Sequence, residues 1–123
     1  MSDISKPPVG GITVRETSDS TIARLWGEID EALRHEAGAA LSRTLDRNLP
    51  VVIDTREVTF IDSTGIAFLI QFCTIGREEG LAVSLADPPA VVTEVLDLLG
   101  LTHMFDAEPV DRSVKGRETQ IDA

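Results

Sequence analysis

Near the middle of the chain lies the stretch Val58-Thr59-Phe60-Ile61-Asp62-Ser63-Thr64-Gly65-Ile66, a short apolar segment that ends in an acid, two hydroxyls and a glycine. An apolar segment with helical spacing comes next, from Ile66 to about Gly76. The pattern predicts a loop that leads into a helix N-terminus, where backbone N–H groups lack partners and a partial positive charge accumulates. Asp, Ser and Thr are the residues that cap such a terminus. On local chemistry alone, Ser63 is a helix cap, and other evidence must decide whether it also carries chemistry.

The segments before this stretch predict two strands, a helix and a third strand. Ile12-Thr13-Val14 and Thr21–Trp26 are separated by a polar turn, so we expect a hairpin. Between positions 29 and 45 an apolar residue recurs every four residues, which is typical of an amphipathic helix with Asp30 as its N-cap. The continuous apolar run Val51-Val52-Ile53 is typical of a strand buried on both faces, and Asp54 ends it.

Beyond the central stretch, the sequence predicts one more strand and a last helix. Leu81–Leu85 alternates as a strand does, and Asp87-Pro88-Pro89 is a helix start with a cap followed by proline. Gly100 ends that helix, with Leu101 as the apolar contact of a Schellman motif. Thr102–Phe105 is a candidate for a short final strand. The result is an α/β domain of order β-β-α-β-α-β-α, with a central mixed sheet of four to five strands and helices packed against it.

One domain accounts for most of the 123 residues. Pro and Gly pairs predict a flexible arm over residues 1–10, the domain spans 11–108, and the polar residues 109–123 predict a loosely attached tail. In open α/β sheets the ligand or partner site lies at the carboxyl ends of the strands. We therefore expect residues 62–65 to occupy the functional rim.

Charge and composition exclude several classes of function. The net charge of −10 argues against a nucleic-acid binder and against binding to anionic membranes, and it favours a basic protein partner, although it also simply confers solubility. No apolar run approaches the ~20 residues of a membrane span. With Cys73 alone and only two histidines, we expect no disulfide, no metal site and no cofactor, and a cytoplasmic location.

Several other side chains have either a chemical or a structural interpretation. Trp26 lies among apolar strand residues and is expected to pack, and His35 lies off the apolar face and is expected to be solvated. Cys73 is predicted to be a buried small hydrophobe and not a nucleophile. Phe68 and Phe72 are four residues apart and belong either to the core or to a contact surface, with the core favoured.

The motifs of the common enzyme classes are absent from the sequence. The serine in Ile61-Asp62-Ser63-Thr64-Gly65 lacks the first glycine of a G-x-S-x-G elbow, and the extra residue spoils an Asp-Ser-Gly protease motif. There is no nucleotide-binding glycine loop. We therefore expect no enzymatic activity, and we consider phosphorylation of Ser63 instead. From the residues alone, a plain N-cap remains the simpler interpretation.

The chain resembles the STAS domain family, specifically the small stand-alone anti-sigma factor antagonists of bacteria. Gly27-Glu28-Ile29-Asp30 resembles the Gly-x-x-Asp that comes after the family's second strand, and Val51–Asp54 resembles its central strand. Val58–Gly65 is similar to the signature loop of the family, and the order of elements also fits. The resemblance covers roughly residues 11–108.

The resemblance implies a partner-switching role in transcription regulation and stress response. In this family the unphosphorylated antagonist binds an anti-sigma factor, a serine kinase with a GHKL-type ATPase fold, and so releases the sigma factor. The kinase then phosphorylates the serine after the signature Asp, and a PP2C-type phosphatase restores it. By position that serine is Ser63. The implied partner-binding residues are Asp30, Asp62, Ser63, Thr64 and Gly65, with Asp62 orienting the loop or contacting the kinase.

The sequence departs from the family pattern at two residues, and two other classes of function stay open. Ala67 and Phe68 stand where many relatives have a glycine and a smaller aliphatic residue, so the resemblance implies the phosphosite but does not define the exact partner surface. The alternative function is a non-catalytic STAS scaffold, or a transport-associated regulatory module held in a stable complex. A small nucleotide-binding or hydrolytic protein is a third class, and no loop in the sequence supports it.

Overall fold

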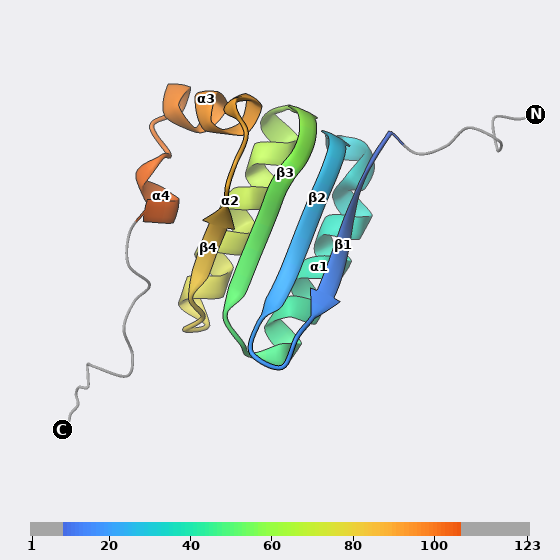
Figure 1. The fold of residues 1–123 in the computed structure, drawn as a ribbon, viewed down its shortest axis with the longest axis vertical. Helices are drawn as coiled ribbons and strands as arrows, with labels where there is room; N and C mark the ends of the chain where they lie inside the picture. The colour runs from blue at the N-terminus through green and yellow to red at the C-terminus, as the bar shows by residue number, and fades with distance from the viewer. Residues whose placement is uncertain (1–8, 107–123) are drawn as a thin grey trace, which may run out of the picture.

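The computed structural model describes residues 9–106, which form a four-stranded mixed sheet and its helices (Figure 1). The strands stand side by side in the order β1-β2-β3-β4. Strand β1 pairs antiparallel with β2, whereas β2 with β3 and β3 with β4 are parallel. The predicted α/β fold class and element order are confirmed. The strands are β1 (Gly10–Glu16), β2 (Thr21–Ile29), β3 (Val51–Ile61) and β4 (Val83–Ala86).

Two long helices connect the parallel strands and lie on the same face of the sheet (Figure 1). Helix α1 (Arg34–Arg47), preceded by the 3-10 turn η2 (Glu31–Leu33), links β2 to β3, and α2 (Ser63–Glu78) links β3 to β4. Helix α3 (Ala90–Leu98) contacts β3, and α4 (His103–Asp106) contacts β4.

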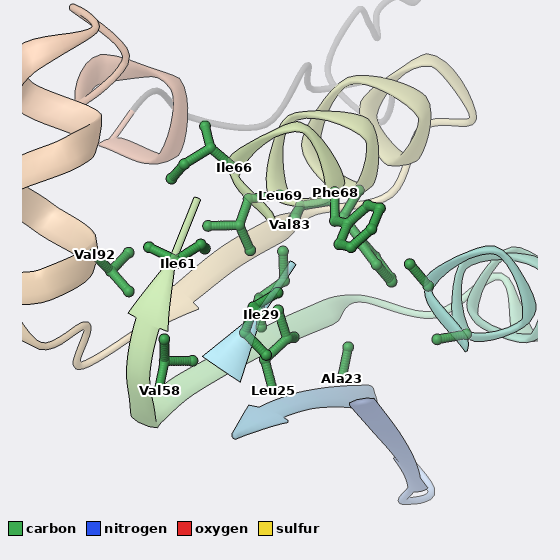
Figure 2. Packing of buried hydrophobic residues seen from close by; sticks show 14 of the residues in the cluster. Ala23, Leu25, Ile29, Val58, Ile61, Ile66, Phe68, Leu69, Val83 and Val92 are labelled. Atoms are coloured by element: carbon green, nitrogen blue, oxygen red, sulfur yellow. The ribbon is translucent and has the colours of Figure 1, made fainter. Parts of the chain in front are cut away.

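The core lies between the sheet and the helices. Val92 of α3 faces the end of β3 at Val58 and Ile61, while Phe68 and Leu69 of α2 point down onto the strands (Figure 2). Burial of this apolar surface contributes about 25 cal/mol per Å² to folding. The largest fully buried apolar side chains are Leu25, Ile29, Val51, Ile53, Ile66, Leu69, Phe72 and Val92.

Strand β3 is longer and less buried than the sequence predicts. It continues through Asp54 to Ile61, because β2 keeps pairing with it across two register shifts. The prediction that Asp54 ends the strand is therefore wrong, as is the predicted loop before Asp62. Val52 is only half-buried, since α1 and α2 cover one face of the sheet and not both.

Three predictions at the C-terminal end of the fold have different outcomes. Gly100 has a positive φ of 70°, and Leu101 N–H donates to Leu96 O at 2.7 Å, which confirms the Schellman end of α3. The Asp87 cap is wrong, because α3 begins after Pro89, which has no capping side chain. The candidate strand at 102–105 is also wrong, since His103 begins the short helix α4.

The predicted arm and tail, residues 1–10 and 109–123, fall almost wholly outside the described residues. Between residues 9 and 106, no helix is both long enough and apolar enough to cross a membrane.

Candidate functional site

The candidate site lies where β2 and β3 end side by side. Ile29 and Ile61 are partners in the parallel register of these strands. Asp30 and Asp62 therefore leave the same edge of the sheet, and Asp62 N–H donates to Ile29 O at 3.3 Å. The parallel register of β2 and β3 brings the two predicted motifs together.

Asp62 is the cap of α2. Its backbone is extended (φ −104°, ψ −171°), and its Oδ1 accepts a hydrogen bond from Gly65 N–H at 2.9 Å. The Asp62 carbonyl accepts the first helical bond, from Ile66 N–H, also at 2.9 Å. The sequence suggested Ser63 as a cap, and this is wrong: Ser63 is the first residue inside the helix. Through this bond the Asp62 side chain closes the turn at the start of α2.

Asp30 caps the preceding helical segment in a similar way. Its Oδ1 accepts a hydrogen bond from Ala32 N–H at 2.9 Å, and the chain makes the 3-10 turn η2 before α1 begins. Capping by Asp30 is confirmed for η2, whereas the N-cap residue of α1 itself is Leu33, which makes no side-chain capping bond. Each aspartate therefore caps the helical segment that opens a crossover at the same rim of the sheet.

The side chain of Ser63 is exposed and uncommitted. Its Oγ makes no hydrogen bond with any residue between 9 and 106, and neither does the hydroxyl of the half-buried Thr64. Because Asp62 does the capping, removal or modification of the Ser63 hydroxyl leaves the bonds of the helix start intact. An anion at this position would also lie at the positive end of the α2 dipole.

Gly65 lets α2 approach the end of β2. A Cβ atom on this buried glycine would lie 2.5 Å from Ile29 O and 2.6 Å from Ile61 Cγ1. No side chain fits in that space without movement of the backbone. The close approach that Gly65 permits is therefore internal, between the helix start and the strand end.

A hollow of about 390 Å³ opens between α1 and α2, with Ser63 on its border. Small residues of both helices leave it open, and a Cβ added at Gly38 would meet no atom within 4 Å. Its lining includes Arg34, Ala37, Gly38, Ser63, Thr64 and Ala67. Arg34 was not singled out from the sequence, because its position beside the same hollow as Ser63 depends on how the two helices pack.

One exposed aromatic residue near the rim was not singled out from the sequence. Phe60, two residues before Asp62, is 48% exposed. Phe68 and Phe72 are both buried, which confirms their assignment to the core. The available signal was the alternation along residues 58–61, which places Phe60 and Ile61 on opposite faces of a strand.

The remaining candidate residues are structural. Burial raises the pKa of the Cys73 thiol, so the reactive thiolate is disfavoured. His35 is exposed, as predicted. Trp26 packs across the hairpin over Gly11, whose added Cβ would lie 2.8 Å from the indole.

On the sheet face opposite α1 and α2, Asp54 forms an ion pair with Arg56 at 2.8 Å. Hydrogen bonding to the Arg56 guanidinium lowers the pKa of the Asp54 carboxyl. Residues 9–106 contain no group of three His, Cys, Asp or Glu side chains that could hold a metal ion.

Comparison with known proteins assigns the family. The family model for the STAS domain matches residues 11–116, which is most of the chain. This chain belongs to the STAS domain family. No curated protein sequence matches it at a significant level.

Solved structures of two similar proteins share the fold. An anti-sigma factor antagonist from Mycobacterium paratuberculosis is 22% identical, with a TM-score of 0.66, and the alignment covers 95% of this chain and 100% of that one. The anti-sigma factor antagonist SpoIIAA in its unphosphorylated form is 14% identical, with a TM-score of 0.60, over 90% and 99% of the two chains. The phosphorylated form of SpoIIAA from Bacillus, described as a cell fate determinant, is 15% identical, with a TM-score of 0.62, over 89% and 99%.

Proposed function

We propose that this STAS domain is an anti-sigma factor antagonist that is switched off by phosphorylation of Ser63. In its unphosphorylated form it binds an anti-sigma factor that is also a serine kinase of the GHKL ATPase type, and the sigma factor is released. A PP2C-type phosphatase reverses the modification. The observation that carries the proposal is the exposed, uncommitted hydroxyl of Ser63 at a helix start that Asp62 caps independently.

The position of Ser63 suits a reversible modification. The kinase would transfer the γ-phosphoryl group of ATP to Oγ, with loss of the hydroxyl proton and release of ADP. The phosphate adds about −1.5 to −2 charges. The N-terminus of α2 accommodates this charge with a gain of roughly 0.3–1 kcal/mol, so the domain stays folded.

A partner docked on the same rim tolerates the phosphate less well. Phe60, two residues before Asp62, supplies exposed apolar surface on the other face of the strand, and Asp30, Asp62 and Thr64 supply polar groups at the rim. A new dianion against desolvated or acidic partner groups costs on the order of 2–5 kcal/mol. At about 1.4 kcal/mol per tenfold change, binding weakens some thirtyfold to a few thousandfold. The modification therefore switches binding without unfolding the domain.

Phosphate mapping tests the modified residue directly. The full chain is incubated with candidate anti-sigma kinases and ATP, and the products are analysed by mass spectrometry. We expect one phosphate on Ser63, none in Ser63→Ala, and normal modification of Thr64→Ala. Stoichiometric phosphate elsewhere, with Ser63 unmodified, would overturn the assignment.

Binding of the same kinases tests the switch. We expect Ser63→Asp to bind at least about tenfold more weakly than the neutral, similarly sized Ser63→Asn, with native far-UV circular dichroism for both. Equal binding by the two variants contradicts a charge switch. A stable complex that neither ATP nor these variants change would indicate the scaffold role instead.

A further inference from the structure

Arg34 stands out among the arginines because it borders the same hollow as Ser63. It comes from the first turn of α1, whereas Ser63 comes from the first turn of α2. It makes no ion pair with any residue between 9 and 106. By contrast, Arg24, Arg43 and Arg56 each pair with a carboxylate: Glu57, Glu16 and Asp54, respectively.

Other charges near the rim are negative. Asp30 caps η2, Asp62 caps α2, and Glu31 lies in the first turn after Asp30. A phosphate on Ser63 would therefore enter a locally acidic region in a chain whose net charge is −10. Like charges repel, so a local cation is needed to offset them. Arg34 is the charged residue in the lining of the hollow.

We propose that Arg34 is the intramolecular partner of the phosphoryl group on Ser63, which it binds across the hollow between α1 and α2. This rests on the proposed function, in which Ser63 is the modified residue. A guanidinium matches two phosphate oxygens at once, and such charge-assisted pairs are stronger than neutral hydrogen bonds.

The hollow provides the room for this pair. Its volume of about 390 Å³ exceeds that of a phosphate group, and it is bounded by the small residues Ala37, Gly38 and Ala67. Because Arg34 has no carboxylate partner within residues 9–106, no ion pair there has to break when it turns toward the phosphate. The pair joins α1 to α2. In the phosphorylated form, part of the charge of the phosphate is therefore neutralised by a side chain of the same domain.

The test uses the second ionisation of phosphoserine, which ordinarily has a pKa near 6. Phosphoserine is introduced at position 63 of the full chain during translation, by stop-codon suppression, so that no kinase is required. The pKa is then measured by ³¹P NMR in the otherwise native chain and in Arg34→Gln. A nearby cation favours the dianion, so we expect the native chain to titrate at least about half a pH unit lower.

Two controls separate a local contact from general charge. Arg15 is also exposed and also lacks an ion pair within residues 9–106, but it borders a hollow on the opposite face of the sheet. We therefore expect Arg15→Gln to leave the titration unchanged. His35 neighbours Arg34 and is a second possible source of positive charge, so the comparison is repeated in a His35→Gln background.

The outcomes distinguish this proposal from the one it rests on. Equal titration of the native chain and Arg34→Gln would overturn the pairing, and so would an equal shift in Arg15→Gln. Neither result depends on a kinase. Failure of kinases to modify Ser63 would overturn the proposed function and leave the measured titration intact.

Discussion

The helical segments after β2 and β3, which begin with η2 and α2, share a capping aspartate but differ in the residues that come after it. Both aspartates leave paired residues of parallel strands, Ile29 and Ile61, and both accept a backbone hydrogen bond at 2.9 Å. After Asp30 the chain makes a 3-10 turn before α1 begins. After Asp62 it enters α2 directly, with an exposed serine first and a buried glycine third.

At this rim of the sheet, the residue that caps the helical segment and the residue that carries a free hydroxyl are different residues. The aspartate performs the capping at each start, so a hydroxyl beside it is not needed for the fold. Only the α2 start presents such a hydroxyl in its first helical position, and only there does a glycine bring the helix against the neighbouring strand. A capping aspartate alone therefore does not indicate a functional site. An exposed hydroxyl that takes no part in capping is the feature that distinguishes the α2 start.

The largest expected effect concerns the close approach at the α2 start. Gly65→Ala places a methyl group 2.5 Å from Ile29 O, so the helix start has to move away from the strand end. We expect the free energy of unfolding to fall by about 1–3 kcal/mol, the range of overpacked cores. Urea denaturation followed by circular dichroism measures it.

Gly38→Ala is the matched control, because the same change occurs in a helix with space around it. Without a clash, alanine favours the helix by roughly 0.5–1 kcal/mol, so the free energy of unfolding should rise. Loss of stability in both variants would mean that the close approach at Gly65 is not the cause.

A smaller effect is expected at the two caps. Asp30→Ala and Asp62→Ala each leave a backbone N–H at a helix start without its partner, and each should lower the free energy of unfolding by about 1 kcal/mol. Differential scanning calorimetry or urea denaturation measures the change. A cost at only one of the two positions would show that the starts are not equivalent in capping.

Asparagine variants are the controls for charge at these caps. Asp30→Asn and Asp62→Asn keep an oxygen acceptor, and Asn caps as well as Asp, so their stability should stay within about 0.5 kcal/mol of the native chain. If the asparagine variants lower the free energy of unfolding as much as the alanine variants do, the carboxylate charge and not the hydrogen bond stabilises the helix start.

The smallest effect is expected at Ser63 itself. Ser63→Ala removes a hydroxyl that makes no hydrogen bond within residues 9–106, so we expect the free energy of unfolding to change by less than about 0.5 kcal/mol. The same variant should lose kinase-dependent phosphorylation completely. If Ser63→Ala instead lowered the free energy of unfolding by about 1 kcal/mol, Ser63 would contribute to capping, and the two helix starts would not differ in this respect.

Local patterns predicted the order of elements, the cap at Asp30 and the burial of Phe68 and Phe72. These features depend on periodicity and on side chains that bond to their own backbone, so short stretches of sequence contain the information. The end of α3 at Gly100 was predictable for the same reason: a left-handed residue followed by an apolar one is a local signal.

Packing decided the features that short patterns do not encode. Strand β3 continues past Asp54 because β2 pairs with it, even though residues 54–57 are polar, and one sheet face stays without a long helix because both crossovers lie on the other. Whether Asp62 or Ser63 caps α2 depends on which side chain reaches the N–H of Gly65. Arg34 and Ser63 are 29 positions apart in the sequence, yet they border the same hollow. They do so because the two parallel crossovers place α1 and α2 side by side. Contacts between residues so far apart in sequence arise from the topology of the sheet, since no local preference brings them together.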